Sequence, residues 1–189
     1  MKKIAVRKRI LAGLLAVALI VPANANVAGA KTQTVLETDV TEASEGCTLV
    51  GVYGSYFAQA KEALAKINAI RKEACEAGNV RDPRDPGRYL TASDYVPLKW
   101  SSDLENIARI RAAEAGIAFR FMDSGHNRLN EKNTFSITSN GISSSSEDLA
   151  YYHVQDMIEG ILLWYSEKQY WVKQDSSEET GHYTSMINP

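Results

Sequence analysis

Three stretches of helical apolar periodicity set the main limits on how this chain can fold. The first runs from about Ser55 to Ala77, the second from Ser102 to about Phe121, and the third, in one or two pieces, from about Asp148 to Val172. Apolar residues recur within them at spacings of three and four, which predicts helices that each bury one face. Gly78 is placed to end the first helix in the left-handed conformation.

Short extended segments are expected between these helices. Val96–Trp100 looks extended, and Phe135–Ser139 alternates apolar and polar residues, as a half-buried strand does. Asn140-Gly141 is a turn signal, and the alternation in His182–Ile187 predicts the opening of another strand. Helices separated by short strands indicate a layered α/β domain.

The first thirty residues have the layout of a secretory signal peptide. Five Lys and Arg residues precede an apolar run from Ile10 to Val21, and small residues follow Pro22. The run is about a dozen residues, short of the roughly 20 that a spanning helix needs, which disfavours the alternative of a retained anchor. Cleavage after Ala25 and cleavage after Ala30 both fit. We therefore expect a secreted, extracellular protein with no transmembrane segment in the mature chain.

The expected organisation is a signal peptide over residues 1–30, a linker or irregular arm over 31–50 and one domain over 51–189. The composition, 44% hydrophobic and 23% charged, excludes a disordered chain and a multi-span membrane protein. Residues 1–30 hold five of the 21 Lys and Arg residues and none of the 23 Asp and Glu. The remainder thus has 16 basic residues and a net charge of −7, which disfavours nucleic acid as a partner.

Cys47 and Cys75 are the two cysteines of the chain. In an exported protein they are compatible with one disulfide or with two unpaired thiols, and the sequence leaves both open. Their spacing does not suggest a thiolate zinc site.

Few residues offer obvious chemistry. His126 and His182 each follow a glycine at a loop edge, whereas His153 sits in a helical stretch, and their spacing alone gives no metal site. Glu147 is expected at a helix start, and aromatic residues flank Glu167. The sequence has no GxSxG, P-loop or HExxH motif, so no nucleophile or zinc-protease site is recognised.

Six segments in order resemble the CAP superfamily of cysteine-rich secretory, antigen 5 and pathogenesis-related proteins, in its bacterial, cysteine-poor branch. Gly181–Met186 is similar to the GHYTQ-type signature, Leu163–Glu167 to the LWxxE segment and Ser146–Ala150 to the GENLA segment. The other three segments are Ile67–Arg71, similar to an LNxxR pattern, Leu98–Trp100, similar to an LxW pattern, and Gly125-His126, which falls where the family carries its first histidine.

The resemblance implies an α-β-α sandwich of the CAP type and a cleft lined by His126, Glu147, Glu167 and His182. Two imidazoles in such a cleft can hold zinc or another divalent metal, and carboxylates can orient them. His153 matches no family position. Ser146 and Asp148 replace the Gly and Asn of GENLA. The family normally continues beyond the position of Pro189, so the C-terminal strands of the sheet are expected to be missing.

Two functions are compatible with this resemblance. We favour a binding or interaction module with a metal-capable cleft, whose partner is a small molecule, a lipid or an extracellular or cell-wall component. The alternative is a metal-dependent hydrolase that acts on peptides or wall polymers, with a glutamate as general base. A third reading is a remnant without function. The fold alone does not choose among them.

Overall fold

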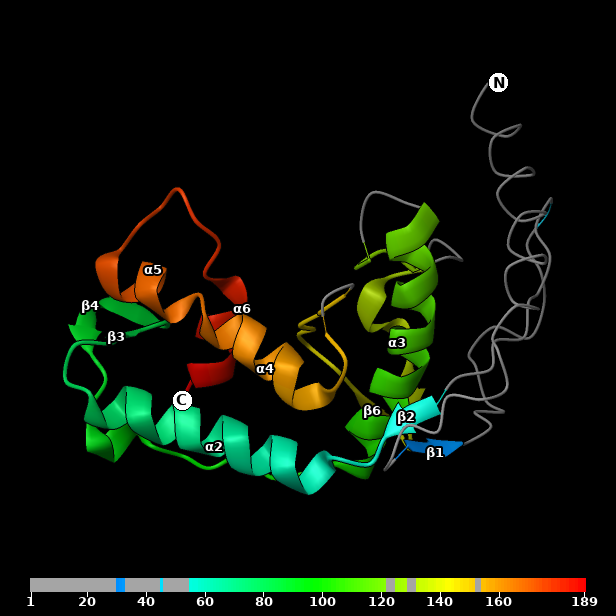
Figure 1. The fold of residues 1–189 in the computed structure, drawn as a ribbon, viewed down its shortest axis with the longest axis horizontal. Coiled ribbons are helices and arrows are strands. Elements are labelled where there is room, and N and C mark those ends of the chain that lie inside the picture. The colour runs from blue at the N-terminus through cyan, green and yellow to red at the C-terminus, as the bar shows by residue number, and fades with distance from the viewer. Residues whose placement is uncertain (1–29, 33–44, 46–54, 122–124, 129–131, 152–153) are drawn as a thin grey trace. The chain divides into compact units, whose positions relative to one another are not determined.

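The computed structural model describes residues 30–32, 45, 55–121, 125–128, 132–151 and 154–189 (Figure 1). The chain forms two compact units that interleave along the sequence. Unit 1 comprises residues 1–58 and 102–145, and unit 2 comprises residues 59–101 and 146–189. Most of the predicted signal peptide, Cys47 and His153 lie outside the described residues.

Unit 1 is organised around one long helix, α3 (Ser102–Phe121), whose bounds match the predicted second helix. Ile107, Arg111, Ala115 and Ala118 are buried on one face, at spacings of three and four. Its other described elements are an antiparallel strand pair, a hairpin and a short 3-10 helix: β1 (Ala30–Thr32) with β2 (Ser55–Phe57), β5 (Thr138–Ser139) with β6 (Ile142–Ser143), and η2 (Thr134–Ser136).

Unit 2 is mainly helical. Its elements in chain order are α2 (Ala60–Glu76), β3 (Arg81–Asp82), β4 (Asp85–Tyr89), η1 (Ala92–Asp94), α4 (Met157–Tyr165), α5 (Lys168–Lys173) and α6 (Gly181–Ile187). Helices α4 and α6 pack against α2 (Figure 1). The buried side chains of unit 2 form one core. Its members are Ala63, Ile70, Ala74 and Cys75 of α2, Ile161 of α4, Tyr183, Met186 and Ile187 of α6, and Val80 and Leu90, which lie outside the helices.

Helix α2 combines strong local propensity with a buried stripe. Its sequence is rich in Ala, Lys and Glu, which favour helix. It ends as predicted, because Gly78 follows it with a φ of +71°, a backbone conformation that glycine adopts without steric cost. Cys75 on the buried face is a free thiol, and burial, together with the charge of Asp94, raises its pKa.

Arg71 links α2 to two distant parts of unit 2. The side chain is buried, and its guanidinium donates to the carbonyls of Met186 (2.7 Å), Asn188 (2.8 Å) and Val96 (3.0 Å). One turn earlier, the Asn68 side chain exchanges two hydrogen bonds with the backbone of Leu98, at 2.7 and 3.1 Å. A buried guanidinium needs such partners, since an unpaired buried charge is costly. The spacing of Asn68 and Arg71 thus holds residues 96–98 against α2.

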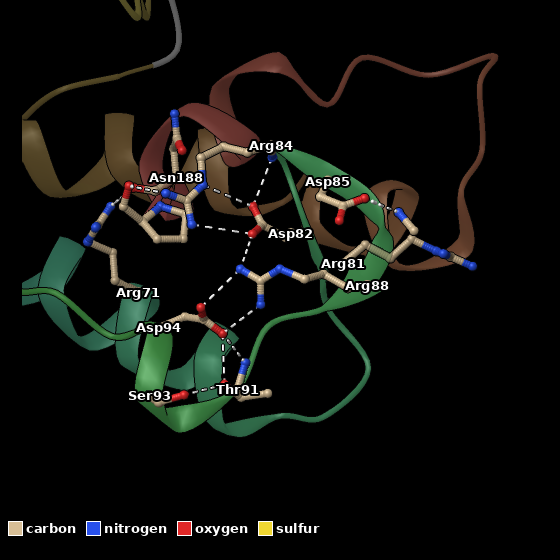
Figure 2. Close-up of polar contacts among 12 residues, drawn as sticks. Arg71, Arg81, Asp82, Arg84, Asp85, Arg88, Thr91, Ser93, Asp94 and Asn188 are labelled. Carbon is tan, nitrogen blue, oxygen red and sulfur yellow. Dashed lines mark hydrogen bonds and ion pairs between the residues drawn. The ribbon is translucent and has the colours of Figure 1, made fainter.

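The hairpin of β3 and β4 is centred on a buried carboxylate. Figure 2 shows Asp82 between two arginine side chains. Arg84 donates its backbone N–H to Asp82 at 2.8 Å, and its guanidinium lies 3.4 Å away. Arg88 pairs with Asp82 and also with Asp94, at 3.0 Å. Burial raises the pKa of Asp82, but the Arg84 hydrogen bonds and the charges of Arg84 and Arg88 outweigh burial and lower it below its ordinary value.

Two helices begin later in the structure than the sequence predicted. The first begins at Ala60, because Ser55–Phe57 pairs as a strand with Ala30–Thr32, a partner that local periodicity does not reveal. The third region is two helices that begin only at Met157, where the Asp156 side chain accepts the Glu159 N–H. The prediction of helix near Asp148 and of Glu147 at a helix start is wrong.

Three predicted strands also differ. His182–Ile187 belongs to α6, so the expected strand is wrong there. Tyr183, Met186 and Ile187 are the buried residues of this segment, and their spacing suits a helix as well as the alternation suits a strand. Val96–Trp100 forms no strand, and Phe135–Ser139 divides between η2 and the two-residue strand β5.

The expected α/β class is confirmed, as the chain mixes helices with short strands. Among the described residues the strands pair as three separate two-stranded antiparallel sheets. In the same part of the chain, no helix has both the length and the apolar character needed to cross a membrane.

Candidate functional site

The four residues expected to line a cleft are divided between the units. His126 lies in unit 1, in a turn after α3. Glu147, Glu167 and His182 lie in unit 2. Within unit 2 the structure brings Glu167 and His182 into direct contact, although 15 residues separate them in sequence. This pair is the nucleus of the candidate site.

Glu167 orients His182 and the first turn of α6. Its Oε1 lies 2.6 Å from Nδ1 of His182, and its Oε2 accepts the backbone N–H of Tyr183 at 3.0 Å. The side chains are 13% and 25% exposed, so the contact is partly shielded from water. Because Nδ1 is engaged, Nε2 is the ring nitrogen left for a ligand or a proton.

Trp164 also contacts the imidazole of His182. Its ring stacks on His182 with 6.1 Å between centroids and 14° between planes. Its indole N–H donates to the carbonyl of Leu149 at 3.2 Å. The tryptophan therefore connects the imidazole to the Ser146–Ala150 segment, which carries Glu147.

Glu147 lies in that irregular segment and is partly buried. The segment approaches α4 closely at Gly160, where a Cβ would lie 3.5 Å from the side chain of Ala150. Helix α4 thus supports Glu147 through its neighbours, at Gly160 and Trp164.

His126 is exposed on a turn that the surrounding side chains hold in place. Its carbonyl accepts the hydroxyl of Thr134 at 2.7 Å, and the buried Arg111 donates to the carbonyl of Gly125 at 2.9 Å. Gly125 packs directly on the Phe119 ring, since a Cβ there would lie 2.2 Å from a ring carbon. The glycine before His126 is therefore required by packing.

Arg111, Glu114 and Arg128 form an ion network next to this turn, which the sequence did not predict. The Glu114 carboxylate pairs with Arg111 and with Arg128, at 2.6 Å in each case, and both arginines are buried. Arg111 and Glu114 are three residues apart on α3, whereas Arg128 comes from beyond the helix. The i,i+3 spacing of Arg111 and Glu114 was visible in the sequence, but the contact with Arg128, 14 residues from Glu114, was not.

Glu179 is a second residue that sequence analysis missed. Glu167, Glu179 and His182 each offer one ligand atom, and these atoms all lie within 4.8 Å of one another. The three side chains could hold a metal ion. The sequence did contain one signal of this proximity, because Glu179 precedes His182 by only three residues.

Two open hollows of unit 2 are lined by residues outside this cluster. One open hollow is lined by residues of α4 and α5 together with Asn79, and another follows the surface of α2. Neither is lined by Glu167, Glu179 or His182. Within the cluster, Glu179 is exposed, whereas Glu167 and His182 are partly buried.

The comparison with known families agrees with the motifs in the sequence. The family model described as "CAP: Cysteine-rich secretory protein family" matches residues 64–189, two thirds of the chain. No curated protein and no solved structure matches the chain. The matched residues include His126, Glu147, Glu167 and His182.

Proposed function

The chain belongs to the CAP, or cysteine-rich secretory protein, family, and on that basis we propose that it is a secreted binding module whose ligand site includes Glu167 and His182. The family supports an extracellular interaction module in general. The partner class we favour is a small molecule, a lipid or an extracellular or cell-wall component. Glu147 is proposed as a further member of the site, and the role expected for His126, which lies in unit 1, stays a prediction.

The observation that supports this proposal is the pre-oriented imidazole of His182. Glu167 holds Nδ1 at 2.6 Å, and Trp164 stacks on the ring. A side chain fixed in this way loses little conformational freedom when it binds a ligand, which increases affinity. The arrangement is also typical of metal-binding histidines, whose second nitrogen is held by a carboxylate or a carbonyl.

The residues present fit a divalent metal. His182 would supply an imidazole nitrogen and a neighbouring carboxylate an oxygen, both of which zinc accepts. When bound, such an ion would supply a positive charge and open coordination positions for an anionic or carbonyl ligand. The protein residues would orient the imidazole and exclude part of the surrounding water.

We favour binding over hydrolysis because the described residues of unit 2 present no nucleophile with an adjacent base and an orienting group. Glu167 uses both carboxylate oxygens, one toward His182 and one toward the Tyr183 N–H. It is therefore occupied as a positioning group. A hydrolase would need a different carboxylate as general base.

The proposal is tested by thermal melts of the purified protein with zinc, with a chelator, and with the variants His182→Ala and His126→Ala. A ligand that binds only the folded state raises the melting temperature. We expect zinc to raise the midpoint of the wild type and not that of His182→Ala. A midpoint that does not respond to zinc would remove the metal from the proposal.

Catalysis is tested separately, with a screen of peptide and glycan substrates. Turnover by the wild type that is lost in His182→Ala would overturn the binding module and establish the hydrolase. Absence of turnover in a protein that binds zinc supports the module.

A further inference from the structure

The turn of the β5–β6 hairpin carries the one Asn-Gly pair of the chain, Asn140-Gly141. Both residues are exposed, and their φ angles of +49° and +80° are those of a type I′ turn. Asparagine is a thermolabile residue, because the backbone nitrogen that follows it can attack its side-chain amide. Glycine in the next position obstructs this attack least, since it has no Cβ. Every other asparagine of the chain precedes a residue with a side chain.

The surroundings leave the attacking nitrogen open and hold the amide in place. Among the described residues, the Gly141 N–H has no hydrogen-bond acceptor, and a Cβ built on Gly141 would meet no atom within 4 Å. The Asn140 Nδ2 donates to Oδ1 of Asp103 in the first turn of α3, at 2.8 Å. The Ser139 hydroxyl donates to the same oxygen, also at 2.8 Å. Asp103 is thus the acceptor for two neighbouring side chains of the hairpin.

We infer that Asn140 is a site of spontaneous deamidation and that the reaction weakens the attachment of the hairpin to α3. The Gly141 nitrogen bonds to Cγ of Asn140, the bond from Cγ to Nδ2 breaks, and ammonia leaves with the proton that the Gly141 N–H gives up. Water then opens the five-membered imide at either carbonyl, which leaves aspartate or isoaspartate at position 140. Nothing is oxidised or reduced. The inference concerns unit 1 and is independent of the ligand site proposed in unit 2.

Both products disturb the contact with α3. In the aspartate product, the Nδ2 that donates to Asp103 is replaced by a carboxylate oxygen that faces the Asp103 carboxylate. Two carboxylates in contact repel each other. In the isoaspartate product, the main chain runs through the side-chain carbons of position 140, which lengthens the turn and breaks its two-residue geometry. Either product therefore removes the Asn140 hydrogen bond and adds a negative charge to the turn.

Peptide mapping of the aged, purified protein by mass spectrometry tests the site. We expect deamidation and isoaspartate at Asn140 before any change at Asn68, Asn79 or Asn106, which are internal controls because a residue with a side chain follows each. The rate should rise with pH, because the attacking nitrogen must lose its proton, and Gly141→Ala should slow it. Conversion of a control asparagine before Asn140, or no conversion at Asn140 after prolonged warming at alkaline pH, would overturn the site.

The structural consequence is tested by urea denaturation of freshly prepared variants. Asn140→Asp reproduces the charge of the aspartate product, and we expect its midpoint to fall below that of the wild type. Adding Asp103→Asn removes the facing charge and should recover most of the loss, with Asp103→Asn alone completing the double-mutant cycle. Asn133→Asp is the matched control, because this exposed side chain accepts the Phe135 N–H instead of facing a carboxylate. Its midpoint should not fall.

The two measurements decide different parts of the inference. An Asn140→Asp midpoint equal to that of the wild type, or a loss that Asp103→Asn does not reverse, overturns the weakened attachment of the hairpin. Deamidation at Asn140 together with a loss that Asp103→Asn reverses supports the whole inference.

Discussion

At the scale of single residues, the buried carboxylate of Asp82 makes a direct prediction. Only 2% of its side chain is exposed, and it accepts hydrogen bonds from Arg84 and Arg88. Replacing Asp82 with Asn removes the charge that both arginines face. We expect a loss of about 2–3 kcal/mol in the free energy of unfolding, toward the low end for a broken buried pair because the arginines are partly exposed. Urea denaturation measures it.

Asp85 is the matched control for this substitution. It lies three residues further along the same hairpin, it is exposed, and it accepts only the Gly87 N–H, at 3.1 Å. Asp85→Asn should change the free energy of unfolding by less than about 0.5 kcal/mol. Equal effects of the two substitutions would show that the burial of Asp82 contributes nothing.

Trp164 supports a second prediction at this scale. Trp164→Phe keeps an aromatic ring beside His182 but removes the hydrogen bond to the Leu149 carbonyl. We expect a loss of about 1 kcal/mol in unfolding free energy, the usual contribution of one hydrogen bond. Urea denaturation checks the magnitude, and zinc affinity in the same variant shows whether the Ser146–Ala150 segment affects the site. A stability equal to that of the wild type would count against the role of this bond.

At the scale of elements, the β5–β6 hairpin depends on backbone conformation. Asn140 and Gly141 have φ angles of +49° and +80°, as the two central residues of a type I′ turn require. Gly141→Ala places a Cβ in that conformation and should cost about 1–2 kcal/mol. The change in stability is measured from the midpoint of urea denaturation.

A glycine inside α3 provides the opposite control. Gly116 is helical, and a Cβ built on it meets no atom within 4 Å. Gly116→Ala should therefore stabilise the protein by about 0.5–1 kcal/mol through the higher helix propensity of alanine. The two glycine substitutions are expected to have opposite signs, and a shared sign would contradict the backbone argument.

The elements that sequence predicted well are those whose signal is local and long. Helix α3 has five turns of consistent periodicity, and its predicted bounds match. Helix α6 was predicted as a strand because it has only seven residues, too few to separate the two periods. The start of α2 was displaced because Ser55–Phe57 takes a strand partner from residues 30–32. These errors arise where a distant segment or a short length decides the structure.

The residues of the candidate site also include some that the sequence predicted and some that it did not. The resemblance pointed to Glu167 and His182, which lie in contact, while the roles of all four cleft residues stay predictions. Glu179 was missed because an exposed glutamate in an acidic loop looks like any solvated side chain. Arg71 and Arg128 were likewise not predicted as buried, since the carbonyls and carboxylates that hold them come from elsewhere in the folded chain.

At the scale of the whole molecule, acid should destabilise the fold. The pKa of Asp82 lies below its ordinary value, and hydrogen bonds from Arg88 and Thr91 hold that of Asp94 well below it. The folded state thus binds these protons less readily than the unfolded state. Stability from the two carboxylates is complete above their ordinary pKa of about 4 and is lost as the pH falls through the lower folded values.

The measurement is a series of urea denaturations between pH 7 and pH 2.5. We expect the free energy of unfolding to fall below about pH 4, and to fall less steeply in Asp82→Asn. A wild-type profile that stays level across this range would contradict the contribution of the Asp82–Arg88–Asp94 network.

The interleaving of the two units has a consequence for biosynthesis. Helix α2 is covered by α4 and α6, and Arg71 donates to a carbonyl 115 residues further along the chain. A ribosome needs on the order of ten seconds to add that length. During this time the apolar stripe of α2 is exposed on the nascent chain, and the residues of unit 1 are made before its covering helices. Unit 2 therefore completes its core only after the unit 1 residues between its two segments have been translated.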